Sequence, residues 1–103
     1  MNEEELSLKF KALADPKRVK ILSALKILKG KTEATSTKVT GLSIRDLENY
    51  LKMSQPNVSH HLMHLKRAKL VKLKTEGPWR IVTINNEELG KVQEYLSRIL
   101  EEV

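Results

Sequence analysis

The chain has 103 residues, 40% of them hydrophobic, which predicts one soluble domain over residues 1–103 with a single modest core. It contains no cysteine, and this excludes disulfides, thiolate metal sites and cysteine-based catalysis. Because the sequence has no apolar run of about 18 residues and begins with an acidic segment, we expect neither a membrane span nor a secretory signal, and we expect a cytoplasmic protein.

The formal net charge of +6 is unevenly distributed along the chain. Residues 1–15 carry two bases against four acids and residues 86–103 carry two against five, whereas the 70 residues between them carry 15 bases and four acids. A basic middle between acidic ends indicates a body that faces a polyanion and terminal segments with another role. A lysine-rich solvated surface would give the same totals, so charge alone leaves both interpretations open.

Two helices are expected in the first third of the chain. Apolar residues with helical spacing predict an amphipathic helix over residues 3–14: Leu6, Phe10 and Leu13. The pair Asp15-Pro16 then predicts a helix over residues 16–28, because Asp caps a helix and Pro has no amide proton to leave unpaired in its first turn. A polar loop over residues 31–41 follows, with a short strand expected near residues 39–42.

Residues 43–69 have the pattern of a helix-turn-helix. Ser43, with Asp46 three residues later, forms a variant of the capping box and begins a helix of about two turns. Ser54 is placed to cap the next helix, which is expected to run to about Lys69. Apolar residues with helical spacing mark both helices: Ile44, Leu47 and Leu51 in the first, and Val58, Leu62 and Leu65 in the second.

After residue 69 the hydrophobic period changes from that of a helix to that of a strand. Alternation, turn chemistry and β-branched residues predict a β-hairpin over residues 70–84. A spacing of three and four residues then predicts a C-terminal helix that pairs with another helix: Leu89, Val92, Leu96, Ile99 and Val103. The expected fold is mainly α with a small β-hairpin, in the order two helices, a short strand, two helices, two strands and a last helix, which is a winged helix-turn-helix.

The helix that begins at Ser54 is the candidate for reading DNA. If its apolar residues face the core, its polar residues lie on or near the opposite side: Ser54, Gln55, Asn57, Ser59, His60, His64 and Arg67. Gln and Asn pair with adenine N6 and N7, and His can donate to guanine N7. Any surface helix has a polar face, but the adjacent hairpin carries bases that suit phosphate contacts: Lys72, Lys74 and Arg80.

The chain resembles the ArsR/SmtB-type repressors, which include arsenical-resistance and metal-sensing regulators. The resemblance rests on FKALADPKRVKIL (10–22), LSIRDLENYLKMSQPNVSHHLMHLKRAKLVK (42–72) and EGPWRIVTI (76–84). It implies a homodimeric winged-helix repressor paired through its first and last helices (1–15 and 86–103), with the helix from Ser54 in the major groove of double-stranded DNA. It also places a partly buried His at position 61. The dimer contacts that we expect are Leu6, Phe10, Leu89, Val92, Leu96 and Ile99.

Metal sensing, a common property of that family, is not expected here. Metal-sensing members have a Cys pair in the segment equivalent to residues 45–48, or His and Asp ligands in the last helix, and this chain has no Cys and no His in residues 86–103. His60 and His64 share a helix face but have no third ligand nearby, which makes a weak site. We therefore expect no metal and no cofactor, and because no catalytic motif is visible, no enzymatic activity.

The sequence as a whole predicts a DNA-binding transcriptional regulator, a repressor that binds an inverted repeat as a homodimer and is associated with the nucleoid. The sequence does not identify a small-molecule effector. Two alternatives stay open: a non-specific architectural DNA-binding protein, and a winged helix that binds another protein through Met63 and its apolar neighbours.

Overall fold

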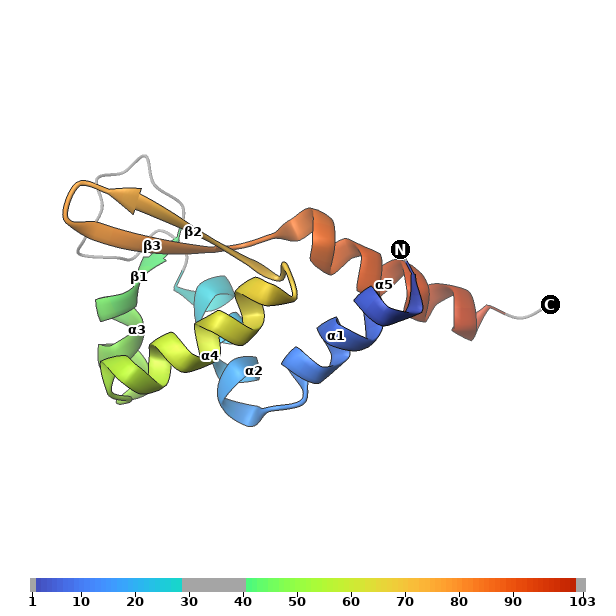
Figure 1. Cartoon of the computed structure of the whole chain (residues 1–103), viewed down its shortest axis with the longest axis horizontal. Coiled ribbons are helices and arrows are strands. Elements are labelled where there is room, and N and C mark those ends of the chain that lie inside the picture. Colours follow the sequence, from blue (N-terminus) through green and yellow to red (C-terminus); the bar gives the residue numbers. More distant parts are fainter. Residues whose placement is uncertain (1, 29–40, 102–103) are drawn as a thin grey trace.

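The computed structural model of the chain describes residues 2–28 and 41–101. Within these ranges, none of the helices is long and apolar enough to cross a membrane. The elements shown in Figure 1 are, in chain order, α1 (Glu3–Leu13), α2 (Pro16–Ile27), β1 (Leu42–Ser43), α3 (Ile44–Leu51), α4 (Gln55–Arg67), β2 (Val71–Glu76), β3 (Trp79–Ile84) and α5 (Asn86–Leu100). This order confirms the predicted winged helix-turn-helix. Most of the predicted loop lies outside the described residues.

The helices begin at the capping residues that the sequence indicates. Asp15 accepts a 2.8 Å hydrogen bond from the Lys17 amide at the start of α2. At the start of α3 the Ser43 hydroxyl accepts from the Asp46 amide, and the Asp46 carboxylate accepts from the Ser43 amide, both at 3.0 Å. Each cap satisfies a backbone group that the first helical turn leaves unpaired.

The end of α4 differs from the prediction by about two residues. The helix stops at Arg67 because Lys69 adopts a left-handed backbone conformation with φ of +62°. Leu70 then donates from its amide to the Leu65 carbonyl at 3.0 Å, and Lys69 donates to the Lys66 carbonyl at 2.9 Å. These are the two bonds of a Schellman motif, here with a lysine at the position that usually holds glycine.

The three strands form an antiparallel sheet in the order β1-β3-β2. Gly41 precedes β1 at a point of close backbone approach, where a Cβ atom would lie 2.5 Å from the Val82 carbonyl oxygen. A larger residue at position 41 would therefore push β1 away from β3.

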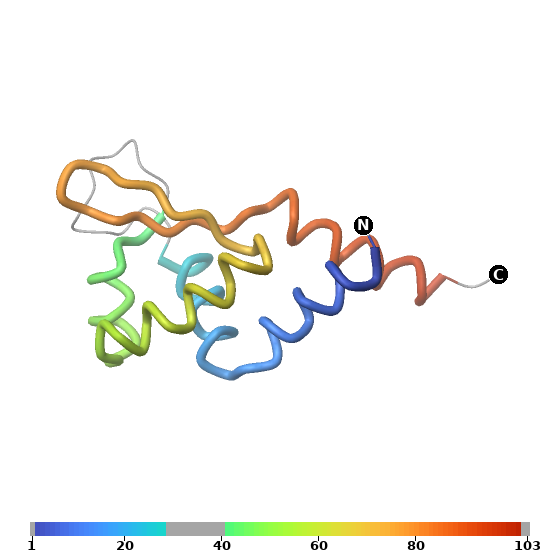
Figure 2. Tube along the Cα trace, in the orientation of Figure 1, coloured from blue at the N-terminus to red at the C-terminus, as the bar shows by residue number. Residues whose placement is uncertain are grey.

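The core lies between α2, α3, α4 and the sheet, at one end of the molecule (Figure 2). Its most deeply buried side chains include Ile21, Leu47, Val58, Leu65, Leu70 and Val82. Leu22 and Leu28 pack against this core but are only half-buried. At the other end, α5 extends beside α1 and away from the core, so that the molecule measures 50 × 27 × 20 Å (Figure 1).

Candidate nucleic-acid interface

Helix α4 has one buried apolar face and one accessible polar face, as the sequence predicts. Val58 and Leu65 are completely buried and Leu62 is nearly so. On the other side the side chains predicted to meet DNA are exposed or half-buried: Ser54, Gln55, Asn57, His60 and Arg67 are exposed, and Ser59 and His64 are half-buried. The buried face therefore anchors the helix while the polar face stays available to a ligand.

Two hydrogen bonds organise the first turns of α4. The Ser54 hydroxyl accepts from the Asn57 amide at 3.4 Å and caps the helix. Gln55 Nε2 donates to the Ser59 hydroxyl at 2.8 Å, one turn further along. The second bond holds the Gln55 amide group along the helix surface, where its remaining donor and acceptor can face a base edge.

All three histidines of the chain lie in α4. The rings of His60 and His64 meet edge to face with their centroids 4.8 Å apart, and the rings of His60 and His61 do so at 5.3 Å. In the parts of the chain that the structure describes, no three His, Asp or Glu side chains are grouped to hold a metal ion. Among the described residues, His60 and His64 therefore have no third ligand placed to complete a metal site with them.

Burial lowers the pKa of His61 below its ordinary value, and the Asp15 carboxylate partly opposes this shift. The His61 side chain is buried, and no group among the described residues bonds to its Nδ1 atom. Burial also lowers the pKa of His64, with a further contribution from the positive charge of Arg18. Both rings are therefore neutral near pH 7, and neutral imidazole can donate from one nitrogen and accept at the other.

The hairpin of β2 and β3 is the wing of the fold, and its strand register divides its three basic residues between its two faces. Thr75 is paired with Arg80, and Lys74 is paired with Ile81. Paired residues of antiparallel strands project from the same face, and successive residues project from opposite faces. Lys72 and Lys74 therefore lie on one face of the wing and Arg80 lies on the other.

A pocket of about 240 Å³ shows which face of the wing is turned toward α4. Its lining residues come from α3, α4 and the wing: Ile44, Ser59, Leu62, Met63, Lys66, Leu73 and Arg80. Arg80 thus borders the same space as Ser59 and Lys66. Lys72 and Lys74 project from the far face, and the Lys74 ammonium is 3.7 Å from the Glu76 carboxylate.

The expected dimer residues divide into those already covered by their own chain and those that are accessible. Leu6 and Val92 are buried within the chain. Phe10 remains 36% exposed, although its ring packs edge to face against that of Tyr95 with centroids 6.1 Å apart. Leu89 is half-buried, whereas Leu96 and Ile99 are 40% and 61% exposed. The packing of α1 on α5 within one chain explains why Leu6 and Val92 have little surface left for a partner.

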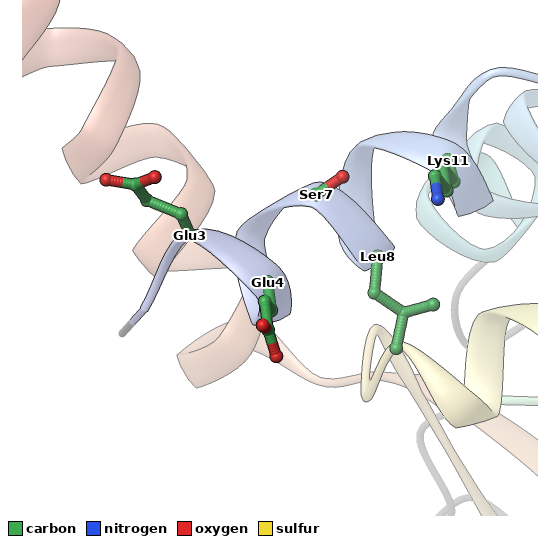
Figure 3. A pocket seen from close by; sticks show the side chains of 5 residues that line it. All are labelled: Glu3, Glu4, Ser7, Leu8 and Lys11. Atoms are coloured by element: carbon green, nitrogen blue, oxygen red, sulfur yellow. The ribbon is translucent and has the colours of Figure 1, made fainter.

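Two open hollows lie on the outer surfaces of these terminal helices. One, of about 620 Å³, is lined by residues of α5 alone, including Leu89, Leu96 and Leu100. The other, of about 390 Å³, is lined by residues of α1 alone: Glu3, Glu4, Ser7, Leu8 and Lys11 (Figure 3). Each hollow is thus the surface of a single helix, with several leucines on the α5 hollow and Leu8 as the one apolar residue of the α1 hollow.

Lys9 is a residue of the terminal helices that the sequence analysis missed. Its side chain is buried, and its Nζ atom donates to the Ala68 carbonyl oxygen at 2.9 Å. The signal was present in the spacing, since Lys9 lies three residues after Leu6 and three before Ala12, both of which are buried. A lysine between two apolar residues of one helix face predicts an ammonium group with a buried partner.

The comparisons with known proteins agree with this geometry. The profile of the family described as "Bacterial regulatory protein, arsR family" matches residues 41–72. The arsenical resistance operon repressor of Bacillus subtilis is 35% identical over 82 residues, which cover 80% of this chain and 68% of the relative.

Solved structures have the same fold. An ArsR-like transcriptional regulator from Rhodococcus superposes with a TM-score of 0.73 at 28% identity, covering 93% of this chain and 79% of the other. A possible ArsR-family regulator from Mycobacterium bovis, described as a homodimeric winged helix-turn-helix DNA-binding domain, superposes with a TM-score of 0.68 at 20% identity, covering 94% of this chain and 79% of the other.

Proposed function

The chain belongs to the arsR family of bacterial regulatory proteins, and we propose that it is a homodimeric transcriptional repressor that binds an inverted repeat in double-stranded DNA. The observation that carries the proposal is the two-sided character of α4, with its apolar side fully buried and its amide, hydroxyl and imidazole groups accessible. The name of the Bacillus relative, which is a repressor, supports the direction of regulation. A cytoplasmic, nucleoid-associated location is part of the same proposal.

In this proposal α4 enters the major groove by its N-terminal half. Gln55 and Asn57 are the candidates for adenine, His60 is the candidate for guanine N7, and Arg67 lies at the other end of the helix for a phosphate. Arg80, beside α4, is the first candidate for a phosphate contact from the wing. Lys72 and Lys74, on the far face, would add attraction to the backbone over a longer range.

The terminal helices provide the support for a dimer. An apolar surface on α5 that its own chain does not cover is typical of a protein-protein contact, and the Mycobacterium bovis neighbour is described as homodimeric. We infer that Phe10, Leu89, Leu96 and Ile99 meet a second copy of the chain, whereas Leu6 and Val92 are buried behind that contact. Two-fold symmetry then presents the recognition helices to half-sites about 10 base pairs apart.

Selection of bound sequences from a random duplex pool, at one stated salt concentration, tests this function. An inverted repeat is expected to be enriched. Failure to enrich any motif despite tight binding would favour non-specific coating of DNA, and failure to bind any duplex at low salt would favour a protein partner.

The recognition helix is tested by an alanine variant on the selected duplex. Asn57→Ala is expected to relax the preference at one or two base pairs, at a cost of about 1–3 kcal/mol. Ser23→Ala, at an exposed position of α2, is the control and should leave the preference unchanged. A uniform loss of affinity over all sequences in Asn57→Ala would contradict base reading by α4.

A further inference from the structure

Lys9 joins three helices at one buried point. The residue lies in α1 and is 2% exposed. Its Nζ atom donates to the Ala68 carbonyl at the end of α4 and lies 3.8 Å from Glu88 Oε1 in the first turn of α5. Lysine is almost never this deeply buried unless it is paired, so these two contacts give it a specific place.

The partner carbonyl lies at the end of the recognition helix. Ala68 is the C-terminal cap of α4, and its carbonyl oxygen lies beyond the helix's own pattern of hydrogen bonds. An ammonium group at this end also meets the negative pole of the helix dipole. Lys9 therefore attaches α1 to the recognition helix at its most favourable end for a cation.

Helix α5 is attached at the same place. The Asn85 amide, at the cap of α5, donates to the Leu70 carbonyl at 2.9 Å, two residues beyond Ala68. Glu88 lies 2.6 Å from the Lys91 ammonium through its other carboxylate oxygen. The hydrogen bond from Lys91 and the positive charge of Lys9 lower the pKa of Glu88, so it stays a carboxylate near neutral pH.

We propose that Lys9 is a positioning residue that sets the distance and angle between the two recognition helices of the dimer, and so selects the half-site spacing of the operator. This inference rests on the proposed function. In a dimer that pairs through the terminal helices, each recognition helix is connected to the dimer contact through α1 and α5 of its own chain. Lys9 and Glu88 lie where these two helices contact the end of α4.

The spacing of half-sites is sensitive to such a change. One base pair moves a half-site by about 3.4 Å along the DNA axis and turns it by about 34°. A dimer whose arms are held rigidly distinguishes that step, because a displaced helix loses base contacts. A dimer whose arms turn freely at the junction with α4 accepts neighbouring spacings.

Binding to duplexes with altered spacing tests the proposal in the full-length dimer. The series contains the selected repeat, the same half-sites with one base pair added or removed, and a duplex with one half-site. The wild-type protein is expected to prefer the selected spacing by about tenfold. Lys9→Met removes both contacts at similar side-chain length, and its preference is expected to fall to within about twofold while single half-site binding is retained.

The controls separate positioning from folding. Lys91→Met removes the outer ion pair of Glu88 but no contact with α4, and it should keep the wild-type spacing preference. Glu88→Gln leaves the bond from Lys9 to Ala68 in place and should weaken the preference in part, which provides a second variant if Lys9→Met does not fold.

The outcomes are distinguishable. Equal losses at all spacings, or an unchanged preference in folded Lys9→Met or Glu88→Gln, would overturn the role of Lys9 and leave the proposed function intact. A wild-type protein that binds all three spacings equally would also overturn the role of Lys9, whereas the proposed function itself is contradicted only if no inverted repeat is enriched.

Discussion

Helices α4 and α5 are both amphipathic, but they differ in what their own chain covers. The apolar side of α4 is closed by the core, with Val58, Leu62 and Leu65 at most 2% exposed. On α5 only Val92 is fully buried, whereas Leu96, Ile99 and Leu100 remain accessible. The single chain therefore covers the whole apolar side of α4, but only part of the apolar side of α5.

The difference indicates two kinds of partner. The exposed face of α4 is polar and therefore stable in water without a partner. Such a face suits a ligand that is bound through hydrogen bonds and charge, as DNA is. The exposed apolar face of α5, in contrast, is stabilised when another apolar surface covers it and removes it from water, by roughly 25 cal/mol per Å² of buried area. The acidic ends and the basic middle of the chain follow the same division, because bases attract a polyanion such as DNA and acids repel it.

The largest expected effect is the loss of dimer affinity when a charge is placed on the exposed apolar face of α5. In Leu96→Glu the carboxylate would be buried without a partner in the dimer, which costs about 3 kcal/mol or more and weakens the dimer about 100-fold or more. Sedimentation equilibrium should show a monomer at concentrations where the wild-type protein is a dimer. Affinity for the inverted repeat should fall with it, while affinity for one half-site changes little.

Glu94→Gln is the matched control for Leu96→Glu. Glu94 is an exposed residue of α5 that pairs with Arg98 at 2.6 Å, and an exposed pair of this kind contributes less than about 1 kcal/mol. A dimer that survives Leu96→Glu unchanged would mean that the accessible face of α5 is not the contact.

A smaller effect is expected from the wing, and it sharpens the assignment of α4 as the DNA-reading helix. Arg80→Gln should weaken binding to all duplexes about tenfold and reduce the slope of log affinity against log salt by about one, because one charged phosphate contact is lost. Lys72→Gln changes the same charge on the opposite face and should cost about twofold or less. Titrations at three salt concentrations compare the two variants. Equal losses would show that DNA does not approach from the side of α4.

Local signals in the sequence were sufficient to predict the order of elements. Caps, turn residues and hydrophobic spacing act within a few residues of one another, and they predicted the start of α3 at Ser43, the start of α4 at Ser54 and the hairpin within residues 70–84. The prediction that Val58, Leu62 and Leu65 face the core is confirmed for the same reason.

Pairings between distant segments were not predictable in this way. The division of Arg80 from Lys72 depends on strand register, which only the paired strands define. The spacing in α1 indicates that Lys9 lies on the buried face, but no local pattern identifies its partners, Ala68, which is 59 residues away, and Glu88. Leu6 and Val92 were predicted as dimer contacts from their spacing, and their burial within the chain itself could not be read from that spacing.

The smallest predicted effect, a pH dependence, should act on α4 and not on α5, because residues 86–103 contain no histidine. The pKa values of His61 and His64 are lowered in the folded chain, mainly by burial, so below about pH 6.5 the unfolded chain binds more protons than the folded chain. The free energy of unfolding should therefore be highest above pH 6.5 and should decrease as the pH falls from 7.5 to 5.5.

Urea unfolding at pH 7.5 and at pH 5.5 measures this decrease in the free energy of unfolding. His61→Gln should reduce it and leave the part that is due to His64. If the dissociation constant of the dimer changed with pH as strongly as the free energy of unfolding does, the expectation that the pH dependence arises in α4 and not in α5 would be contradicted.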